Sequence, residues 1–212
     1  MPHTPTPTMN AAYVNIHTHR PTGRDIELRT AGIHPWEAGE RPVEAAVQAL
    51  KTELARGQAQ ALGEIGLDFA KAADSKTRDA QAALFRAQLA LACEQGLPVV
   101  LHCVRAFEET MRLLREQRPR AVIFHGFIGS PEQARQAAAH GCFLSFGERS
   151  FASPRTVAAL QTMPLAQLFL ETDESPTPIG EVYARAAALL GIPVETLQAA
   201  TTDNYRRIFM LE

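Results

Sequence analysis

The sequence predicts an α/β protein in which parallel strands and crossover helices form a trimmed or distorted TIM-like (β/α) barrel. Short apolar, β-branched segments alternate with segments of helical periodicity, which is typical of a parallel sheet. The 212 residues suit a single barrel domain near the lower end of the usual range of about 200–250 residues. Histidines and carboxylates follow the predicted strands, on the side where the active sites of barrels form.

Seven short apolar segments are predicted strands: 13–19, 29–35, 60–68, 97–103, 120–126, 141–147 and 167–173. Six segments show helical periodicity: 43–56, 77–95, 106–117, 131–140, 154–160 and 180–190. A complete barrel requires an eighth strand, which we expect in the C-terminal third. The rival architecture is an open doubly wound sheet, but the sequence contains no GxGxxG and no Walker motif. The barrel domain is expected to span residues 11–212.

Composition and charge exclude several classes of protein. Hydrophobic residues make up 46% and charged residues 21%, as in ordinary globular domains rather than disordered chains. The formal net charge of −2 gives no overall basic field for nucleic acid or anionic membrane, so a site for a polyanion must be local. No apolar run approaches the ~18 residues that span a bilayer. We therefore expect no membrane association.

The N-terminus and the cysteines predict a cytoplasmic protein. Residues 1–10, MPHTPTPTMN, are rich in Pro and Thr and are expected to form a disordered tail without the features of a secretory signal. Cys93, Cys103 and Cys142 form an odd set without CxxC spacing, as expected for reduced thiols. Cys103 follows His102, and neighbouring strand residues face opposite ways. We therefore expect Cys103 in the core rather than at a metal.

Histidines gather at the ends of the predicted strands. Five of the seven lie at or just after a C-terminal strand end: His17, His19, His34, His102 and His125. Glu64 and Asp173 occupy the same kind of position. Because a barrel brings the carboxyl ends of its strands to one face, these side chains are expected to meet there. No requirement of secondary structure explains the clustering, so we predict a functional site on this face.

The residue types at this face favour divalent cations. His17 and His19 form an HxH pair on one strand, so both side chains project to the same side. Glu64 and Asp173 end apolar strands, where an unpaired charge is costly and a cationic partner is expected. Each residue alone is also compatible with a hydrogen-bonded structural role. Together, four imidazoles and two carboxylates are best satisfied by two metal ions that share a carboxylate.

Six motifs in order resemble those of one family. They are NIHTH, GIHP, ALGEIGLDF, LPVVLHC, HGF and FLETD, and the segment NYRRIF at 204–209 is similar to a closing NxxRxF signature. Over residues 13–209 the chain resembles the TatD-like metal-dependent hydrolases, which implies a TIM-like barrel with a binuclear metal site. By motif, one ion would be held by His17, His19, Glu64 and Asp173. The second would be held by Glu64, His102 and His125, so that Glu64 bridges the two.

The chain departs from the family pattern at several positions. Asn15 replaces the Asp of a DxHxH motif, although that residue is not an implied ligand. HCVRAF replaces the commoner HSRDA and moves the arginine by one place, to Arg105. HGF replaces HCF. After FLETD the chain enters the next predicted helix almost directly, where the family has a longer loop, so contacts at the substrate end are in doubt.

The resemblance implies hydrolysis of phosphodiester bonds, as a deoxyribonuclease with 3′–5′ exonuclease-like action on single-stranded ends. Its implied cofactors are two divalent ions, Mg, Mn or Zn, among which His and carboxylate ligands discriminate little. Glu64 and Asp173 are the candidate catalytic residues, with Asp173 also accepting a proton. His34, Trp36 and Arg105 are the candidate substrate contacts, because an indole can stack on a base and a guanidinium fits phosphate. The expected partner is DNA with single-stranded ends, or a small phosphodiester.

Two other interpretations stay open. One is an amidohydrolase-type enzyme that cleaves C–N or carboxyl-ester bonds, including D-aminoacyl-tRNA deacylation. Many amidohydrolases bridge their metals with a carboxylated lysine, and none of Lys51, Lys71 and Lys76 ends a predicted strand. The other is a non-catalytic barrel that retains metals, which we would expect to lack one of the ligands.

Overall fold

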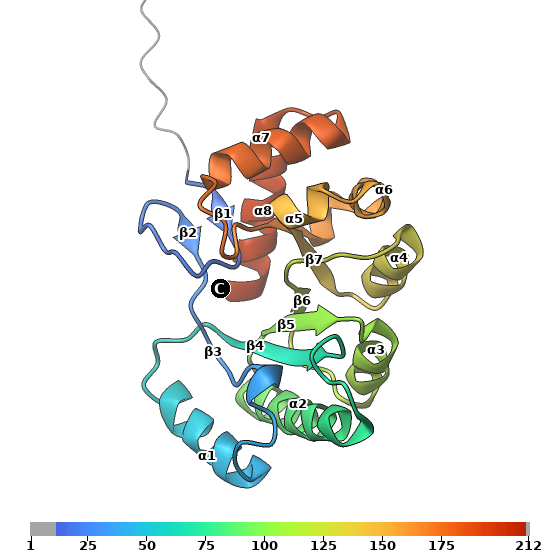
Figure 1. Cartoon of the computed structure of the whole chain (residues 1–212). Coiled ribbons are helices and arrows are strands. Elements are labelled where there is room, and N and C mark those ends of the chain that lie inside the picture. Colours follow the sequence, from blue (N-terminus) through green and yellow to red (C-terminus); the bar gives the residue numbers. More distant parts are fainter. Residues whose placement is uncertain (1–11, 211–212) are drawn as a thin grey trace, which may run out of the picture.

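The computed structural model describes residues 12–210, so the predicted tail at 1–10 lies outside the described residues. Its strands are β1 Val14–Asn15, β2 Ile26–Glu27, β3 Thr30–Ala31, β4 Ala61–Asp68, β5 Val99–Val104, β6 Val122–Phe124, β7 Phe143–Phe146 and β8 Leu168–Leu170. Strands β3 to β8 form one sheet in sequence order, β1 pairs with β2, and all of these pairings are parallel. The predicted fold class, α/β with a parallel sheet, is confirmed (Figure 1).

Backbone hydrogen bonds close the strands into a ring. The Ile16 N–H donates to the Leu170 carbonyl over 3.1 Å, and Thr18 forms a parallel bridge with Asp173, so β1 lies beside β8. On its other side β1 pairs with β2, and β2 and β3 are two parts of one segment, 26–31. The ring therefore has seven strand positions, with helices on its outside (Figure 1).

Six helices lie where the periodicity predicts them, and the described residues form two more. They are α1 Val43–Leu54, α2 Ser75–Gln95, α3 Phe107–Glu116, α4 Pro131–Ala139, α5 Glu148–Phe151, α6 Pro154–Thr162, α7 Ile179–Leu190 and α8 Val194–Phe209. Two 3-10 turns, η1 and η2, span Pro35–Glu37 and Leu165–Gln167. The six predicted helices correspond to α1 to α4, α6 and α7, with ends that differ by no more than two residues. Neither α5 nor α8 was predicted from the sequence pattern.

Two expectations about the strands are wrong. The strand predicted at 29–35 is reduced to Thr30–Ala31, because Pro35 has no N–H to donate to a ladder and instead begins η1, with His34 as its N-cap. The eighth strand expected in the C-terminal third is absent from the described residues, in which α7 and α8 follow β8. The buried residues of α7, which include Ile179, Val182 and Ala186, recur at helical rather than strand spacing.

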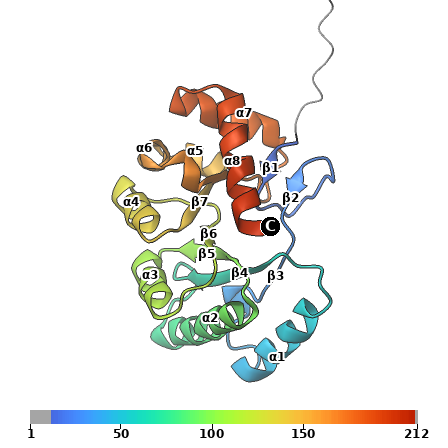
Figure 2. The same cartoon turned by 180° about the vertical axis from the view of Figure 1, so that it is seen from behind.

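The interior of the ring is apolar and is closed at one end by α8. Val100 of β5, Ile123 of β6 and Phe169 of β8 share one buried cluster with Tyr205 and Ile208 of α8. The neighbouring strand residues belong to a second cluster, formed with the outer helices, as the alternation of strand side chains requires. Figure 2 shows α8 from behind, packed along β1 and β8.

The closing motif NYRRIF is therefore part of the floor of the barrel. Asn204 donates through Nδ2 to the carbonyls of Leu165 and Leu168, over 2.8 and 2.9 Å. The Tyr205 hydroxyl accepts a hydrogen bond from Nε2 of Gln60, the residue before β4, over 2.9 Å. These contacts fix α8 to the amino ends of the strands, opposite the rim predicted to hold the site.

Within residues 12–210, no helix is long and apolar enough to cross a membrane.

Asn15 secures the seam at which the ring closes. It is 3% exposed, its Nδ2 donates to Thr172 Oγ1 over 2.9 Å, and its Oδ1 accepts from the Thr172 N–H over 3.0 Å. An Asp at this position would keep the acceptor for the N–H. The Thr172 hydroxyl, which now donates to Thr18 Oγ1, could then donate to the second carboxylate oxygen.

We predict that Asn15→Ala lowers the free energy of unfolding by about 1–3 kcal/mol, because it leaves the buried Thr172 N–H without an acceptor. Asn15→Asp is the matched control and should lose less. Urea unfolding followed by circular dichroism measures both. Equal losses for the two variants would show that the pair of hydrogen bonds does not hold the seam.

Candidate metal centre

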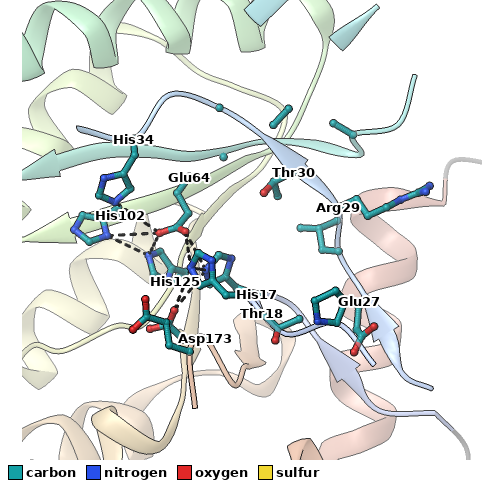
Figure 3. A pocket seen from close by; sticks show the side chains of 18 of the residues that line it. His17, Thr18, Glu27, Arg29, Thr30, His34, Glu64, His102, His125 and Asp173 are labelled. Atoms are coloured by element: carbon teal, nitrogen blue, oxygen red, sulfur yellow. Dashed lines mark hydrogen bonds and ion pairs between the residues drawn. The ribbon is translucent and has the colours of Figure 1, made fainter. Parts of the chain in front are cut away.

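The predicted site residues converge at the carboxyl ends of the strands (Figure 3). Glu64 lies on β4 and His102 on β5, and His125 follows β6 by one residue. His17 and His19 follow β1. Asp173 follows β8 and is bonded to the same segment, because its N–H donates to the His17 carbonyl and its carbonyl accepts from the His19 N–H. The barrel thus brings together residues that lie on, or directly follow, five different strands.

A glycine lets β4 and β5 approach closely beside the site. Gly66 pairs with His102 and has a φ of +140°, and a Cβ built on it would lie 2.0 Å from the His102 carbonyl oxygen. Only glycine tolerates both the conformation and the distance. The GEIGLD motif therefore supplies both a carboxylate and the room that the neighbouring histidine strand needs.

The two oxygens of Glu64 face different histidines. Oε1 lies 3.2 Å from His17 Nε2 and 3.1 Å from His19 Nε2. Oε2 lies 2.8 Å from His125 Nε2 and 3.6 Å from His102 Nδ1. Glu64 is thus a central carboxylate with one oxygen directed to each of two donor groups, which is the arrangement that a bridging ligand requires.

Asp173 belongs to the Oε1 side of this arrangement. Its Oδ1 lies 3.7 Å from His17 Nε2 and 3.5 Å from His19 Nε2. Its φ of +52° is unusual for a residue other than glycine, and the two backbone bonds to the β1 segment hold it there. This geometry aims the Asp173 carboxylate at the same point as the HxH pair.

Two carboxylates that the sequence analysis missed orient the histidines of the Oε2 side. Asp68 Oδ2 lies 3.2 Å from His102 Nε2, and Glu171 Oε1 lies 3.4 Å from His125 Nδ1. In each ring the carboxylate faces one nitrogen and leaves the other directed to Glu64, as supporting carboxylates do at metal sites. Both residues are part of the quoted motifs, GLD and ETD, which was the available signal.

Electrostatics keeps Glu64 ionised. Burial alone would raise the pKa of Glu64, but hydrogen bonds from His102, His125 and His17 outweigh it and hold the pKa well below its usual range. Burial alone would lower the pKa of His125, but Glu171 and Glu64 raise it to about 10. In Asp173, burial and then the neighbouring Glu171 charge raise the pKa. Without metal, a proton on His125 therefore balances part of the negative charge.

The site forms part of a cavity of about 1240 Å³ that continues along β2 and β3 to the C-terminal end of α1. His34 and Trp36, two of the residues predicted to contact substrate, line this cavity. The His34 Nε2 lies 4.0 Å from Glu64 Oε2, and burial, followed by the nearby His102, lowers the His34 pKa to about 4. His34 is therefore a neutral group beside the cluster, close enough to be an additional ligand.

Arg105 does not line this cavity. It lies at an adjoining cavity of about 610 Å³, whose lining also includes Arg155, Ile128 and Phe127. His125 lines both cavities, so they meet at the cluster. Cys103 has the structural place expected of it: its Sγ is 3.4 Å from Thr110 Oγ1, and burial raises the pKa of the thiol to about 11.

The described residues fit divalent cations. Four groups of residues each have ligand atoms within 4.8 Å of one another: His17, His19 and Asp173; His17, Glu64 and His125; His34, Glu64 and His102; and His125, Glu171 and Asp173. Imidazole nitrogens and carboxylate oxygens are suitable ligands for Zn, Mn and related ions. Which ligands bind which ion remains the prediction given by the motifs.

Comparisons with known proteins define the class. The model of the TatD related DNase family matches residues 25–210. The 3′-5′ ssDNA/RNA exonuclease TatD of Enterobacter lignolyticus is 32% identical over 203 residues, which cover 85% of this chain and 76% of that protein. The uncharacterized metal-dependent hydrolase YabD of Bacillus subtilis is 31% identical over 206 residues, 88% of this chain and 79% of that protein.

A solved structure agrees with these relatives. YJJV, a TatD homologue from Escherichia coli, matches with a TM-score of 0.78 at 26% identity, over 88% of this chain and 78% of that chain. The barrel and the cluster of histidines and carboxylates at its rim are those of a metal-dependent hydrolase. The chain belongs to the TatD related DNase family.

We predict that Glu64→Gln lowers metal occupancy sharply while the protein stays folded. An amide cannot offer a negatively charged oxygen to each donor group, so we expect the apparent affinity to fall by at least about tenfold. Glu53→Gln, which alters a carboxylate at the far end of the same cavity, is the matched control. Metal analysis after dialysis measures the occupancy, and unchanged metal content in Glu64→Gln would contradict the bridging role.

Proposed function

We propose that this protein hydrolyses phosphodiester bonds with two divalent ions, as a 3′–5′ exonuclease that acts on single-stranded ends. One observation carries the proposal: the two oxygens of the ionised Glu64 face different histidines. Oε1 lies 3.1–3.2 Å from Nε2 of His17 and His19, and Oε2 lies 2.8 Å from Nε2 of His125. A relative with 32% identity is named as an exonuclease for single-stranded DNA and RNA, which supports this choice of substrate.

The side chains of the cluster would divide the work. His17, His19 and Asp173 would hold one ion with Glu64 Oε1, and His102 and His125 would hold the other with Oε2. Bound divalent ions would supply the acidification of water and the stabilisation of phosphoryl charge that two-metal hydrolases use. Asp173 directs its carboxylate into the open cavity, where it can accept a proton from the attacking water.

The charge of the cavity supports a metal requirement for substrate binding as well as for chemistry. Seven carboxylates line the larger cavity, against four cationic side chains: Arg29, Arg56, Lys71 and Arg149. A phosphodiester approaching without metal would meet a net negative surface. Two divalent ions would offset this charge at the centre, so metal removal should weaken nucleic acid binding and not only turnover.

The two cavities at the rim of the barrel support a nucleic acid substrate with a single-stranded end. The two cavities meet at His125 and differ in size, about 1240 and 610 Å³. A strand crossing the cluster would place its body in the larger cavity, along Trp36, and its terminal nucleotide in the smaller one. There Arg105 and Arg155 offer guanidinium groups and Ile128, 57% exposed, offers an apolar surface to a base.

The alternative hydrolases receive less support. A carboxylated lysine is not needed as a bridge here, because the Glu64 carboxylate already lies between the two pairs of histidines. Lys51 is bonded to Glu94 over 2.6 Å, and Lys71 lies over the ring of Trp36, 5.4 Å from its centre. Cleavage of C–N or carboxyl-ester bonds, including D-aminoacyl-tRNA deacylation, and a non-catalytic metal-binding barrel are therefore the outcomes to test against. The cytoplasmic location stays a prediction.

We predict that protein reloaded with Mg, Mn or Zn shortens a single-stranded oligonucleotide from its 3′ end. Asp173→Asn should reduce the rate by at least about a hundredfold, because it removes the proton acceptor as well as a ligand charge. Gel analysis of 5′-labelled substrate, with metal content measured in parallel, tests this. Metal-loaded protein that cleaves amides or carboxyl esters, and no phosphodiester, would contradict the proposal.

We predict that Arg105→Ala raises KM for the same oligonucleotide by about fivefold to tenfold with little change in kcat, the effect of one lost charge-assisted contact. Arg135→Ala is the control, because Arg135 pairs with Glu132 on the outer helix α4. A KM that is the same for both variants would remove Arg105 from the substrate path.

A further inference from the structure

The exposed ring of Trp36 has a buried polar contact at its edge. Trp36 lies in η1, is 58% exposed, and is the single tryptophan of the chain. Its indole N–H donates to Asp68 Oδ2 over 2.7 Å. Its ring meets His34 edge-on at 4.5 Å between centroids. A ring so exposed adds little to the apolar core, so this hydrogen bond is its most specific contact with the protein.

Each carboxylate oxygen of Asp68 has two hydrogen-bond partners. Its Oδ1 accepts from the backbone N–H groups of Ala70 and Lys71, each over 3.0 Å. Its Oδ2 accepts from Trp36 and faces His102 Nε2 at 3.2 Å. The residue is 3% exposed, so no bulk water is available to replace a missing donor. Each of its oxygens therefore depends on protein groups for its position.

This arrangement fixes which nitrogen of His102 carries the hydrogen. The backbone N–H groups of Ala70 and Lys71 and the indole N–H of Trp36 all donate to Asp68, so its carboxylate acts only as an acceptor. His102 must then carry its hydrogen on Nε2, which leaves the Nδ1 lone pair directed to Glu64 Oε2 at 3.6 Å and His125 Nε2 at 3.4 Å. Nδ1 is the atom that can bind an ion on the Oε2 side.

We infer that Trp36 is a positioning residue of the metal centre: its indole N–H holds Asp68, which holds His102 with Nδ1 facing the ion on the Oε2 side of Glu64. This inference rests on the metal binding of the proposed function and deepens it. It assigns the edge of Trp36 to the metal site, whereas Lys71 lies over the ring, 5.4 Å from its centre. Loss of the N–H alone would leave Asp68 Oδ2 with one donor fewer and His102 less firmly oriented.

The single tryptophan permits a test at one atom. Replacing tryptophan throughout the protein by benzothienylalanine alters only residue 36. Sulfur takes the place of the indole N–H, and the shape of the ring is kept. Protein labelled with 5-fluorotryptophan, which retains the N–H, is the matched control. Trp36→Phe is the genetic counterpart, and His102→Ala identifies the titration step of the Oε2 side.

We expect calorimetric titration with Mn²⁺ to show two binding steps in the control. In the benzothienyl protein, the Mn²⁺ affinity of the step that His102→Ala abolishes should fall by about tenfold, the lower end of the usual effect of groups that support a ligand. The affinity of the other step should stay unchanged. The fluorescence of the 5-fluorotryptophan protein should change only during the step of the Oε2 side. At saturating metal, kcat should return toward that of the control.

Two contrary results are distinguishable. Equal Mn²⁺ affinity in the benzothienyl and fluoro proteins, at both steps, would overturn the role of Trp36 while the proposed function stands. Failure of every protein, the unmodified one included, to bind Mn²⁺ would instead overturn the proposed metal chemistry itself. A raised KM for oligonucleotide with unchanged metal affinity would assign Trp36 to base stacking alone and would also overturn the inference.

Discussion

A largely buried carboxylate, Glu64, lies at the centre of the barrel mouth, and its low pKa keeps it ionised. Glu64 lies on β4 with its oxygens 2.8–3.2 Å from three histidines, and its low pKa depends on hydrogen bonds that outweigh burial. These histidines follow β1 and β6, strands that do not neighbour β4 in the ring. A closed ring is therefore required, because an open sheet would separate β1 from β6.

The two ends of the barrel differ in polarity: the amino end is packed with apolar side chains, and the carboxyl end carries the polar site. At the amino ends of the strands, Tyr205 and Ile208 of α8 fill the interior with apolar side chains, and the NYRRIF motif is explained by stability alone. At the carboxyl ends, polar side chains continue the same inward-facing positions: His102 follows Val100 by two residues, His125 follows Ile123, and Glu171 follows Phe169. The apolar side chains hold the strands in place, and the strands in turn hold the histidines in position.

Much of the fold and the cluster could be predicted because both depend on local patterns. Short apolar, β-branched segments located the strands, and the polar residues within or just after them located Glu64, His102 and His125. Asp68 and Glu171 could not be found in this way, because their roles depend on which nitrogen of a neighbouring histidine they face. The place of Arg105 in a second cavity likewise depends on how the loop after β5 turns, with a φ of +53° at that residue. The seven predicted strands correspond to the seven positions of the ring. The eighth, expected from the usual number of strands in a barrel, is absent from the described residues, in which α7 and α8 follow β8.

The proposed function requires that one carboxylate, that of Glu64, joins two ions. Electron paramagnetic resonance of protein loaded with two equivalents of Mn(II) tests it most directly, because ions bridged by Glu64 are magnetically coupled. The account predicts the spectrum of a coupled pair in the unaltered protein, and the spectrum of isolated ions when Glu64 is replaced by Gln. Isolated Mn(II) in the unaltered protein at full loading, or a coupled pair that survives the replacement, would contradict it.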